Sequence, residues 1–381
     1  MIKRVIHFVT RINAEASGPA NSVPNLAAFA QSSSSKKIHH VLVTLDNEKQ
    51  NDIHSSQINL GSIDLAHNVT LSFRLFYFAL KLFFSRDNLR VHIIHVHGAW
   101  GLVNFVGPIL ARFTSIPLVI SPRGSLSKWA IKSGSPFKKI IWPIQRYLFG
   151  FAQIFHATSE AEYKDIKRFF PAIHCVIIPN GLNIELIQQH LARLDEEGAG
   201  NTLRKQIIFL SRIHPKKGIM ELLEAWGLVN YHFPDWYLKI YGEGEPNFSS
   251  RVLALVDQLP NCSFEGPVFG LEKYRILRNA NLMILPTYSE NFGMVIAESL
   301  ACGTPVLVGK ESPWHEVQDR FGWLCDPSDD SLPHILTDAL KMSETTLRSM
   351  GMAGRDYVFE KYDWTNIGRQ FHNQIYLDLI K

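Results

Sequence analysis

The sequence predicts an α/β protein with two doubly wound domains, and three observations support this fold class. The chain has 381 residues, which at about 150 residues per domain leaves room for two domains. Short β-rich segments alternate with helical patterns in both halves. Several of these segments are continuously apolar, such as Leu118–Ile120 and Leu282–Leu285, which is typical of parallel strands covered on both faces.

Twelve segments are predicted to be strands, six in each half of the chain. Those of the first half are Arg4–Thr10, His39–Leu45, His92–His97, Pro117–Ser121, Gln153–Thr158 and Cys175–Pro179. Those of the second half are Lys205–Ser211, Trp236–Tyr241, Cys262–Phe264, Leu282–Pro286, Pro305–Val308 and Gly322–Cys325. Because strand, helix and strand follow one another repeatedly, each half is expected to form a doubly wound parallel sheet.

Helical patterns fill the gaps between the strands. Ser159 and Glu162 have the spacing of a capping box, with Ser159 as the N-cap. Residues 219–229 place apolar side chains along one stripe, and residues 364–381 do the same with Ile367, Phe371 and Ile375. An amphipathic helix must pack on another surface, and we expect the terminal one to return to the first domain.

The domain boundary is predicted from a change in composition. The segment 186–202 ends in the polar, glycine-bearing run D-E-E-G-A-G-N, which has no apolar period and indicates a linker. The first domain is then 1–185 together with the helix at 364–381, and the second domain is 203–363.

Composition and charge exclude several function classes. With 39 Lys and Arg against 35 Asp and Glu, the net charge is +4, which does not indicate a nucleic-acid-binding protein. The four cysteines lie far apart, without the spacing of a zinc site. No Asp-x-Asp sequence follows a strand, so we expect no bound divalent cation and no metal ligands.

The most informative motif is Pro286–Glu298. A strand is expected to end near Pro286, and a helix to begin around Gly293. The first N–H groups of a helix have no intrahelical acceptor and bind anions or hydroxyls, and a glycine there lets a ligand approach the backbone. Glu290 in the loop and Glu298 in the helix add two carboxylates. The set suits a ligand with phosphate and sugar hydroxyls; two solvated surface acids are the alternative.

A basic motif follows the first strand of the second domain. Arg212 lies at the end of that strand, and Lys217-Gly218 opens the next helix. Open α/β sheets bind ligands at the carboxyl ends of their strands. The planar fork of Arg212 and the point charge of Lys217 would neutralise a diphosphate without a metal. A solvated basic turn is the alternative.

Taken together, these motifs resemble the retaining glycosyltransferases of the GT-B fold, family 4. The block E-N-F-G-M-V-I-A-E-S-L-A-C-G-T-P-V at 290–306 carries most of the likeness. Pro179-Asn180-Gly181 resembles the interdomain P-N-G of that family, and Tyr241–Gly244 its strand-end G-x-G. The segments Ile120–Leu126 and Ser312–Trp314, with Gly322-Trp323, resemble the branch that builds bacterial surface polysaccharides. The implied fold is two Rossmann-like domains facing across a cleft.

The resemblance assigns roles in binding a donor. Glu298 would bind the ribose hydroxyls of a nucleotide-sugar, and Glu290 would face the donor sugar. Arg212 and Lys217 would stabilise the departing diphosphate. The remaining donor-binding positions that the resemblance implies are the amides of Asn291, Phe292 and Gly293, with Gly242, Val268 near the nucleobase and Gly18 in the loop after the first strand.

The first domain departs from the family pattern at two places. Pro19 follows Gly18 where the family has a second glycine, and this removes one N–H donor. Arg123 stands where the family carries a histidine near the donor sugar, and it would contact a phosphate or an acidic acceptor instead. His97 is a second candidate facing the cleft; a hydrogen-bonded histidine at a strand end is the alternative.

The implied reaction is metal-independent, retaining transfer of a sugar from a UDP- or GDP-sugar to a saccharide or lipid-linked acceptor, in lipopolysaccharide, capsule or exopolysaccharide synthesis. A nucleotide-sugar epimerase of the same two-lobe fold is the main alternative. A dehydrogenase is weaker, because Asn247 replaces the third glycine of G-x-G-x-x-G. A sugar-binding protein without catalysis is a third alternative.

A cytoplasmic protein is expected, because the N-terminus runs into a strand without a signal sequence and Leu75–Phe84 is too short to span a bilayer. Peripheral contact with the inner face of an anionic membrane is a further expectation. This expectation of membrane contact depends on basic and aromatic residues clustered near 128–149. The alternative is an ordinary packed helix with a solvated basic face. The cluster comprises Lys128, Trp129, Lys132, Phe137, Lys138, Lys139, Trp142, Arg146, Tyr147, Leu148 and Phe149.

Overall fold

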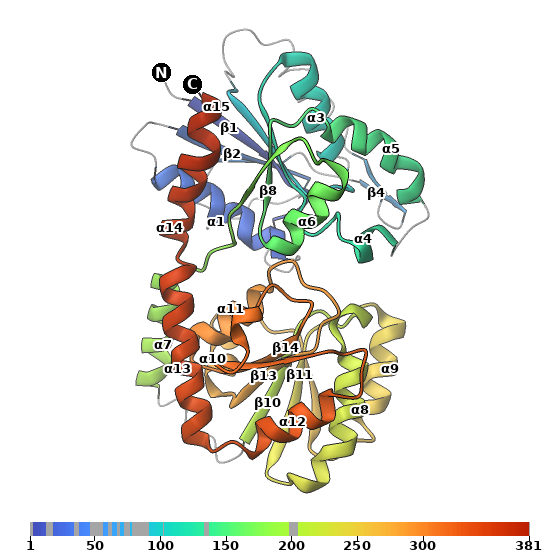
Figure 1. Cartoon of the computed structure of the whole chain (residues 1–381), viewed down its shortest axis with the longest axis vertical. Helices are drawn as coiled ribbons and strands as arrows, with labels where there is room; N and C mark the ends of the chain where they lie inside the picture. Colours follow the sequence, from blue (N-terminus) through green and yellow to red (C-terminus); the bar gives the residue numbers. More distant parts are fainter. Residues whose placement is uncertain are drawn as a thin grey trace. The chain divides into compact units, whose positions relative to one another are not determined.

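The computed structural model describes residues 3–12, 18–33, 38–45, 56–59, 63–66, 69–71, 77, 91–101, 103–132, 137–197 and 205–380. These residues form two compact units, each a sheet with helices packed on it (Figure 1). The first unit comprises Met1–Gly181 and Trp364–Lys381, and the second comprises Leu182–Asp363. Each unit is described separately below.

The first unit contains a seven-stranded sheet in the order β3-β2-β1-β6-β7-β8-β9. Every neighbouring pair in it is parallel. The strands are β1 (Lys3–Phe8), β2 (Ile38–Thr44), β3 (Ser56–Asn59), β6 (Ile93–His97), β7 (Leu118–Ser121), β8 (Ile154–Ala157) and β9 (His174–Ile177). The six predicted strands of this half are confirmed, whereas β3 and the antiparallel pair β4 (Ile63–Ala66) and β5 (Val69–Leu71) were not predicted.

Helices pack on this sheet and bury its apolar strands. The helices that precede the second unit are α1 (Gly18–Ser32), α3 (Val103–Thr114), α4 (Lys128–Lys132), α5 (Phe137–Phe149) and α6 (Glu160–Phe169). The capping box at the start of α6 forms only in part. Ser159 Oγ accepts from the Glu162 amide at 3.2 Å as predicted, but the Glu162 carboxylate turns to the amides of Thr158 and Gly124 instead of reciprocating.

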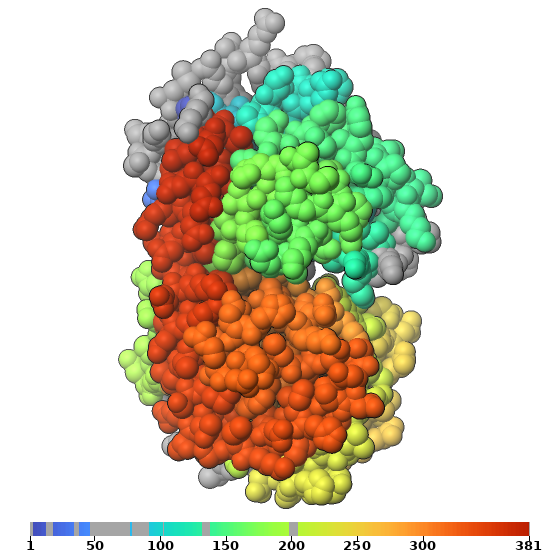
Figure 2. Space-filling view, in the orientation of Figure 1, coloured from blue at the N-terminus to red at the C-terminus, as the bar shows by residue number. Residues whose placement is uncertain are grey.

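The C-terminal segment also belongs to the first unit. It consists of α14 (Trp364–Phe371), one π-helical turn (His372–Tyr376) and α15 (Leu377–Ile380). Ile367, Phe371 and Ile375 are buried against the sheet, which is the apolar face predicted for this helix. Gly368 packs so closely on Phe29 of α1 that an added Cβ would lie 2.6 Å from the Phe29 carbonyl carbon. The outer side of these helices, in red, forms part of the surface of this unit (Figure 2).

The second unit contains a six-stranded parallel sheet in the order β12-β11-β10-β13-β14-β15. Its strands are β10 (Lys205–Leu210), β11 (Trp236–Tyr241), β12 (Cys262–Gly266), β13 (Leu282–Leu285), β14 (Val306–Gly309) and β15 (Gly322–Cys325), as predicted within two residues. Its helices are α7 (Ile184–Glu196), α8 (Ile219–Val229), α9 (Pro246–Val256), α10 (Gly270–Asn279), α11 (Met294–Ala301), α12 (Leu332–Lys341) and α13 (Glu344–Lys361).

The linker predicted at 186–202 is wrong over most of its length. Residues 184–196 form α7, in which Ile187, Leu191 and Leu194 are buried at the spacing of one helical face. The chain passes from the first unit to the second at Gly181–Leu182 and back at Asp363–Trp364. Residues 198–204 lie outside the described ranges.

Among the described residues, no helix combines the length and apolar character needed to cross a bilayer. The apolar stretch Leu75–Phe84 lies outside these residues except for Tyr77.

Candidate active site

The order of strands in the second sheet places two loops next to each other. From β10 the chain builds β11 and β12 on one side, and then β13, β14 and β15 on the other. The neighbours β10 and β13 are therefore the switch point, where ligands bind in open α/β sheets. The loops that leave these two strands carry the predicted basic and acidic motifs, respectively.

The backbone of the two loops is packed in direct contact. The Tyr288 amide donates to the Lys216 carbonyl at 2.9 Å, and Thr287 Oγ1 donates to the same carbonyl at 3.1 Å. Gly218 has a φ of +69°, and a Cβ at this position would lie 1.9 Å from the Pro286 carbonyl oxygen. Only glycine satisfies both conditions, so Gly218 fixes the position of the preceding lysine.

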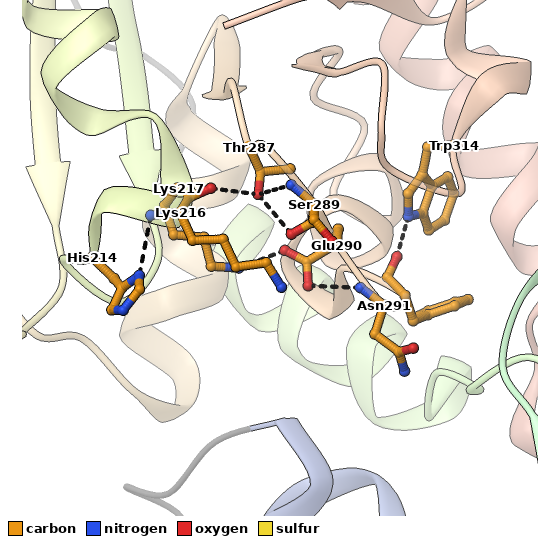
Figure 3. Close-up of polar contacts among 9 residues, drawn as sticks. His214, Lys216, Lys217, Thr287, Ser289, Glu290, Asn291 and Trp314 are labelled. Carbon is orange, nitrogen blue, oxygen red and sulfur yellow. Dashed lines mark hydrogen bonds and ion pairs between the residues drawn. The ribbon is translucent and has the colours of Figure 1, made fainter. Parts of the chain in front are cut away.

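Lys217 and Glu290 form an ion pair across these loops (Figure 3). Lys217 Nζ lies 2.5 Å from Glu290 Oε2, and the side chains are only 11% and 14% exposed. Burial opposes ionisation of Glu290, but the charge and hydrogen bond of Lys217 outweigh it and hold the pKa of Glu290 below its usual value. The structure therefore brings together two residues that lie 73 positions apart in the sequence.

The cluster around this pair is positively charged overall. Arg212 is exposed and makes no hydrogen bond or ion pair with any residue that the structure describes. Burial and the charges of Arg212 and Lys216 lower the pKa of His214, which favours the neutral ring. Lys216 and Lys217 act on the charge of Glu290, and Arg212 acts on Lys216 and His214. The cations of this cluster thus outnumber its one carboxylate, and the excess of positive charge suits an anion.

The N-terminus of α11 adds backbone donors beside Glu290. Gly293 adopts a left-handed conformation with a φ of +81° at the N-cap, where no side chain caps the helix. The amides of Phe292, Gly293 and Met294 find no acceptor within the described ranges. The Phe292 carbonyl accepts a hydrogen bond from the buried Trp314 indole, which anchors the loop (Figure 3). The Asn291 amide donates to Glu290 Oε1 at 3.2 Å.

Glu298 lies on α11, and its partner was not predicted. Lys273 of α10 donates from Nζ to Glu298 Oε1 at 2.7 Å, with side chains 21% and 13% exposed. The pair leaves Glu298 Oε2 as an acceptor for a ligand hydroxyl. Lys273 lies in a helix without a recognisable motif, 25 residues from Glu298, so only the packing of α10 on α11 reveals it.

The remaining predicted positions of this unit lie in the loops after β11 and β12. A Cβ on Gly242 would lie 1.8 Å from the Ser211 carbonyl oxygen, so this glycine is needed for close packing of the loop on the β10 loop. The Gly242 amide donates to the Gly266 carbonyl at 2.9 Å. Val268 follows two residues later and is partly buried against the core.

In the first unit, Gly18 is the first residue of α1 and not part of a loop as predicted. Nothing lies within 4 Å of an added Cβ there. Residues 13–17, which precede it, lie outside the described part of the chain.

Arg123 occupies a strained turn after β7. Arg123 and Gly124 both have positive φ, 56° and 78°, and the Ser125 amide donates to the Pro122 carbonyl. A positive φ is costly for a non-glycine residue and is common at functional sites. The guanidinium donates to Asn180 Oδ1 at 2.5 Å and to Ser22 Oγ at 3.4 Å. Burial lowers its pKa to about 10, opposed by the charge of Glu162, and leaves it charged at neutral pH.

His97, at the end of β6, is 3% exposed and lies in a cluster of buried histidines that the sequence did not reveal. The cluster comprises His7, His40, His95, His97 and His156. Burial is the main reason why the pKa of His40 and of His156 falls to about 3 and why the others fall well below 6.5. One nitrogen of each of His7, His95 and His97 lies within 4.8 Å of the others.

Family models match both units. A Glycosyl transferase 4-like domain matches residues 17–181, and a Glycosyl transferases group 1 domain matches residues 193–356. The chain belongs to the GT-B glycosyltransferases of the family 4 type. The predicted fold class of two Rossmann-like domains is thereby confirmed.

This glycosyltransferase resembles proteins of known name. A phosphatidyl-myo-inositol mannosyltransferase from Mycobacterium leprae is 31% identical over 202 residues, which covers 51% of each chain. The chain thus spans about half the length of the curated relatives it matches. Solved structures with the same fold include two that match almost the whole chain. Sucrose-phosphate synthase from Thermosynechococcus elongatus has a TM-score of 0.78 at 19% identity, covering 99% of both chains. Anabaena HepE in complex with UDP and glucose has a TM-score of 0.76 at 15% identity, covering 98% of this chain and all of that one.

Proposed function

We propose that this glycosyltransferase moves a sugar from a UDP- or GDP-linked donor to a saccharide or lipid-linked acceptor of a bacterial surface polysaccharide, with retention and without a metal ion. The curated relative is named as a transferase that acts on phosphatidyl-myo-inositol, and HepE is named in a complex with UDP and glucose. The first name agrees with a lipid-bearing acceptor, and the second agrees with a nucleotide-sugar donor. The Trp314 motif, which led to the surface-polysaccharide branch, supports the loop that holds Glu290.

In the proposed reaction the bond between the anomeric carbon and the diphosphate oxygen breaks, and a bond to the acceptor oxygen forms on the same face. The departing diphosphate oxygen takes the acceptor proton. Arg212, Lys217 and the amides at the start of α11 stabilise the negative charge that develops on that diphosphate. Glu298 Oε2 accepts from a ribose hydroxyl, and Glu290 faces the sugar while it holds Lys217 in place.

The single observation that carries this proposal is the ion pair of Lys217 and Glu290 at the switch point, in two loops that also carry the exposed Arg212 and lead into the N-terminus of α11. A sugar-binding site without a phosphate ligand gives no reason to gather Arg212, Lys216 and Lys217 near a helix N-terminus. Cations and backbone amides placed there stabilise a departing diphosphate.

The test compares an Arg212→Ala/Lys217→Ala double variant with the wild-type chain, using UDP- and GDP-sugars and a lipid extract as the acceptor source. We expect kcat to fall by a factor of at least about a thousand, while Glu290→Gln retains donor binding and loses turnover. Full activity of the double variant would refute the proposal. An isomerised sugar formed from the donor alone would favour the epimerase instead.

A membrane-facing surface supports the lipid-linked acceptor. Neither α3 nor α5 contains an acidic residue, and their exposed sides carry apolar and basic groups together. The apolar members are Phe113, Ile140, Ile144 and Tyr147, between 58% and 70% exposed, and the basic members are Arg112, Lys139 and Arg146. We propose that this surface lies on an anionic bilayer.

The structure changes the set of residues that was predicted for this surface. Leu148 and Phe149 are buried in the core and face away from it, while Ile140 and Ile144 were not predicted. The side chains of Lys132 and Phe137 lie outside the described set.

Vesicle flotation tests the surface. Serine in place of Ile140 and Ile144 should lower binding to vesicles containing anionic lipid by at least about tenfold, because two apolar side chains no longer enter the bilayer. Leu228→Ser, at an equally exposed leucine of the second unit, is the matched control and should bind as the wild type does. Equal flotation of all three proteins would refute the membrane contact.

A further inference from the structure

The buried histidines of the first unit lie on neighbouring strands of its sheet. His7 of β1 is the Cα partner of His95 in β6, and His97 is the partner of Ser121 in β7. His40 lies on β2 beside β1, and His156 lies on β8 beside β7. The rings and the Ser121 hydroxyl are connected by short hydrogen bonds. Burial keeps the five rings neutral, so each has one donor and one acceptor nitrogen.

The first hydrogen-bond chain runs from Arg123 through His97 and His7 to His40. Arg123 Nη2 lies 3.5 Å from His97 Nδ1, and a guanidinium can only donate, so this nitrogen must accept. His97 then carries its proton on Nε2 and donates to His7 Nδ1 at 2.9 Å. His7 in turn donates from Nε2 to His40 Nδ1 at 2.8 Å.

The last ring of this chain is left with an unsatisfied donor. His40 must carry its proton on Nε2, and this nitrogen is buried without a hydrogen-bond partner among the described residues. The chain therefore ends inside the protein and does not lead to solvent, so it cannot deliver protons. Its donors all point away from Arg123 and its acceptors all point toward it.

The second chain runs from Tyr376 through His95 and Ser121 to His156. The Ile178 carbonyl can only accept, so His156 donates to it from Nε2, at 2.7 Å. His156 Nδ1 then accepts from the Ser121 hydroxyl at 2.7 Å, and Ser121 Oγ accepts from His95 Nε2, also at 2.7 Å. His95 Nδ1 accepts from the Tyr376 hydroxyl at 2.8 Å.

The first chain reaches the Arg123 guanidinium directly, and the second reaches it only through the backbone between Ile178 and Asn180. The first presents an acceptor nitrogen to it directly. The second fixes the carbonyl of Ile178, two residues before Asn180, whose Oδ1 accepts from Arg123. No carboxylate forms an ion pair or hydrogen bond with Arg123 among the described residues, and Arg123 Nε is buried without a partner. Neutral acceptors therefore hold the guanidinium without neutralising its charge.

We propose that His97, His7 and His40 and the chain Tyr376–His95–Ser121–His156 are positioning residues that hold Arg123 in one orientation, with its full positive charge available to an anionic group of a substrate. The effect of this positioning on activity rests on the proposed sugar transfer. The hydrogen bonds themselves do not depend on that reaction.

Three of the histidines, His7, His95 and His97, lie close enough together to bind a metal ion. Their hydrogen bonds argue against a metal site. Both nitrogens of His7 and both of His95 already bond to His40, His97, Ser121 and Tyr376. A metal ion would have to break these bonds beside the positive charge of Arg123 and without a carboxylate ligand.

The direct test is nitrogen-15 NMR of the imidazole rings in the full chain, with each ring assigned by its own His→Gln variant. We expect the Nε2–H tautomer in His7, His40, His95, His97 and His156. A ring of this set that carries its proton on Nδ1, or that shifts only when zinc is added, overturns the proposal.

Arg123 variants then test what sets the direction of the first chain. In Arg123→Ala the donor to His97 Nδ1 is gone and water can reach that position, so the three rings should reverse to the Nδ1–H tautomer and relieve the buried donor of His40. The second chain, fixed by the Ile178 carbonyl, should stay unchanged in the same spectrum. Arg123→Lys, which keeps a cationic donor, should restore the wild-type pattern. Unaltered tautomers in Arg123→Ala overturn the proposal.

Activity measurements link the chain to the reaction. Both His97→Asn and His97→Leu remove the bond to His7, but only asparagine retains an acceptor oxygen for Arg123. We expect kcat/KM of the leucine variant to be about tenfold lower than that of the asparagine variant at similar melting temperatures. Equal kcat/KM values would overturn the positioning role. Because the spectra need no substrate, a failed proposed function would leave the tautomers as predicted, whereas a failed positioning role would change them.

Discussion

In the second domain the candidate site is held by full charges in contact, whereas in the first domain it is held by neutral rings. Lys217 and Glu290 neutralise each other beside the exposed Arg212. Around Arg123 the five histidines are uncharged, and their hydrogen bonds depend on which nitrogen carries each proton. The two arrangements respond differently to acid. In the second domain, protonation removes the charge of Glu290, whereas in the first domain it would create positive charges on buried rings that water does not solvate.

Acidification should separate the two domains most strongly. A histidine whose folded pKa lies below the unfolded value of 6.5 stabilises the fold fully above that value and loses this contribution as the pH falls below it. Below pH 6.5, five such rings together lower the free energy of unfolding of the first domain by about 7 kcal/mol per pH unit. Since domains are stable by about 5–15 kcal/mol, the first domain should unfold near pH 5.

The second domain should persist to lower pH. The depressed pKa of Glu290 means that its ion pair is present above the usual carboxyl value of 4.5 and is lost only below it. Peptide-resolved hydrogen exchange, corrected for the intrinsic effect of pH, measures both domains in one sample. The control is His174→Gln, a substitution at an exposed histidine of the first domain. It should not change the pH at which half of this domain is unfolded. Simultaneous loss of protection in both domains would contradict the comparison.

Removing the Glu290 charge should have the next largest effect. In Glu290→Gln the Lys217 ammonium stays largely buried without a counter-charge, so the free energy of unfolding of the second domain should fall by about 3 kcal/mol. Urea denaturation followed by hydrogen exchange in that domain measures this loss. Glu272→Gln, which breaks an exposed pair with Arg275, is the matched control and should change little. Equal free energies of unfolding in the two variants would mean that the Lys217–Glu290 pair does not stabilise the second domain.

Glycine substitutions should give the smallest of these effects and the clearest contrast. Gly218→Ala places a Cβ against the Pro286 carbonyl at a positive φ, and should destabilise the second domain by about 2 kcal/mol and displace Lys217. Gly18→Ala meets open space in the first turn of α1 and should stabilise the first domain by at most about 1 kcal/mol. The melting temperatures of both variants, compared with that of the wild type, test this contrast. A lower melting temperature of Gly18→Ala would contradict it and would mean that the backbone at residue 18 requires glycine.

The second-domain site was predictable because its residues lie in short runs at strand ends. The Glu290 motif and the Arg212 motif each follow a buried apolar strand, and the order of the sheet brings the two loops together. What the sequence could not provide was the pairing itself. Lys273 belongs to no motif, and its contact with Glu298 depends on how α10 packs on α11.

The first-domain network was missed because it is spread over separate strands. His7 and His156 occur singly inside apolar segments, and His40 follows His39 at the start of another; none of them forms a motif. A polar residue in a continuously apolar strand is the signal that was available, and its repetition on four strands indicates a shared interior. The linker error has a similar origin. The spacing of Ile187, Leu191 and Leu194 is that of one helical face, but the polar, glycine-bearing run that follows is typical of a linker.

The return of residues 364–380 to the first domain has a consequence for biosynthesis. Trp364 packs against Gly181, Gly368 against Phe29, and Tyr376 begins the second histidine chain, so these late residues complete a core that was started at β1. A ribosome emits them only after every residue of the second domain. We therefore expect the second domain to reach its native state first during translation, while the N-terminal part waits for its final helix.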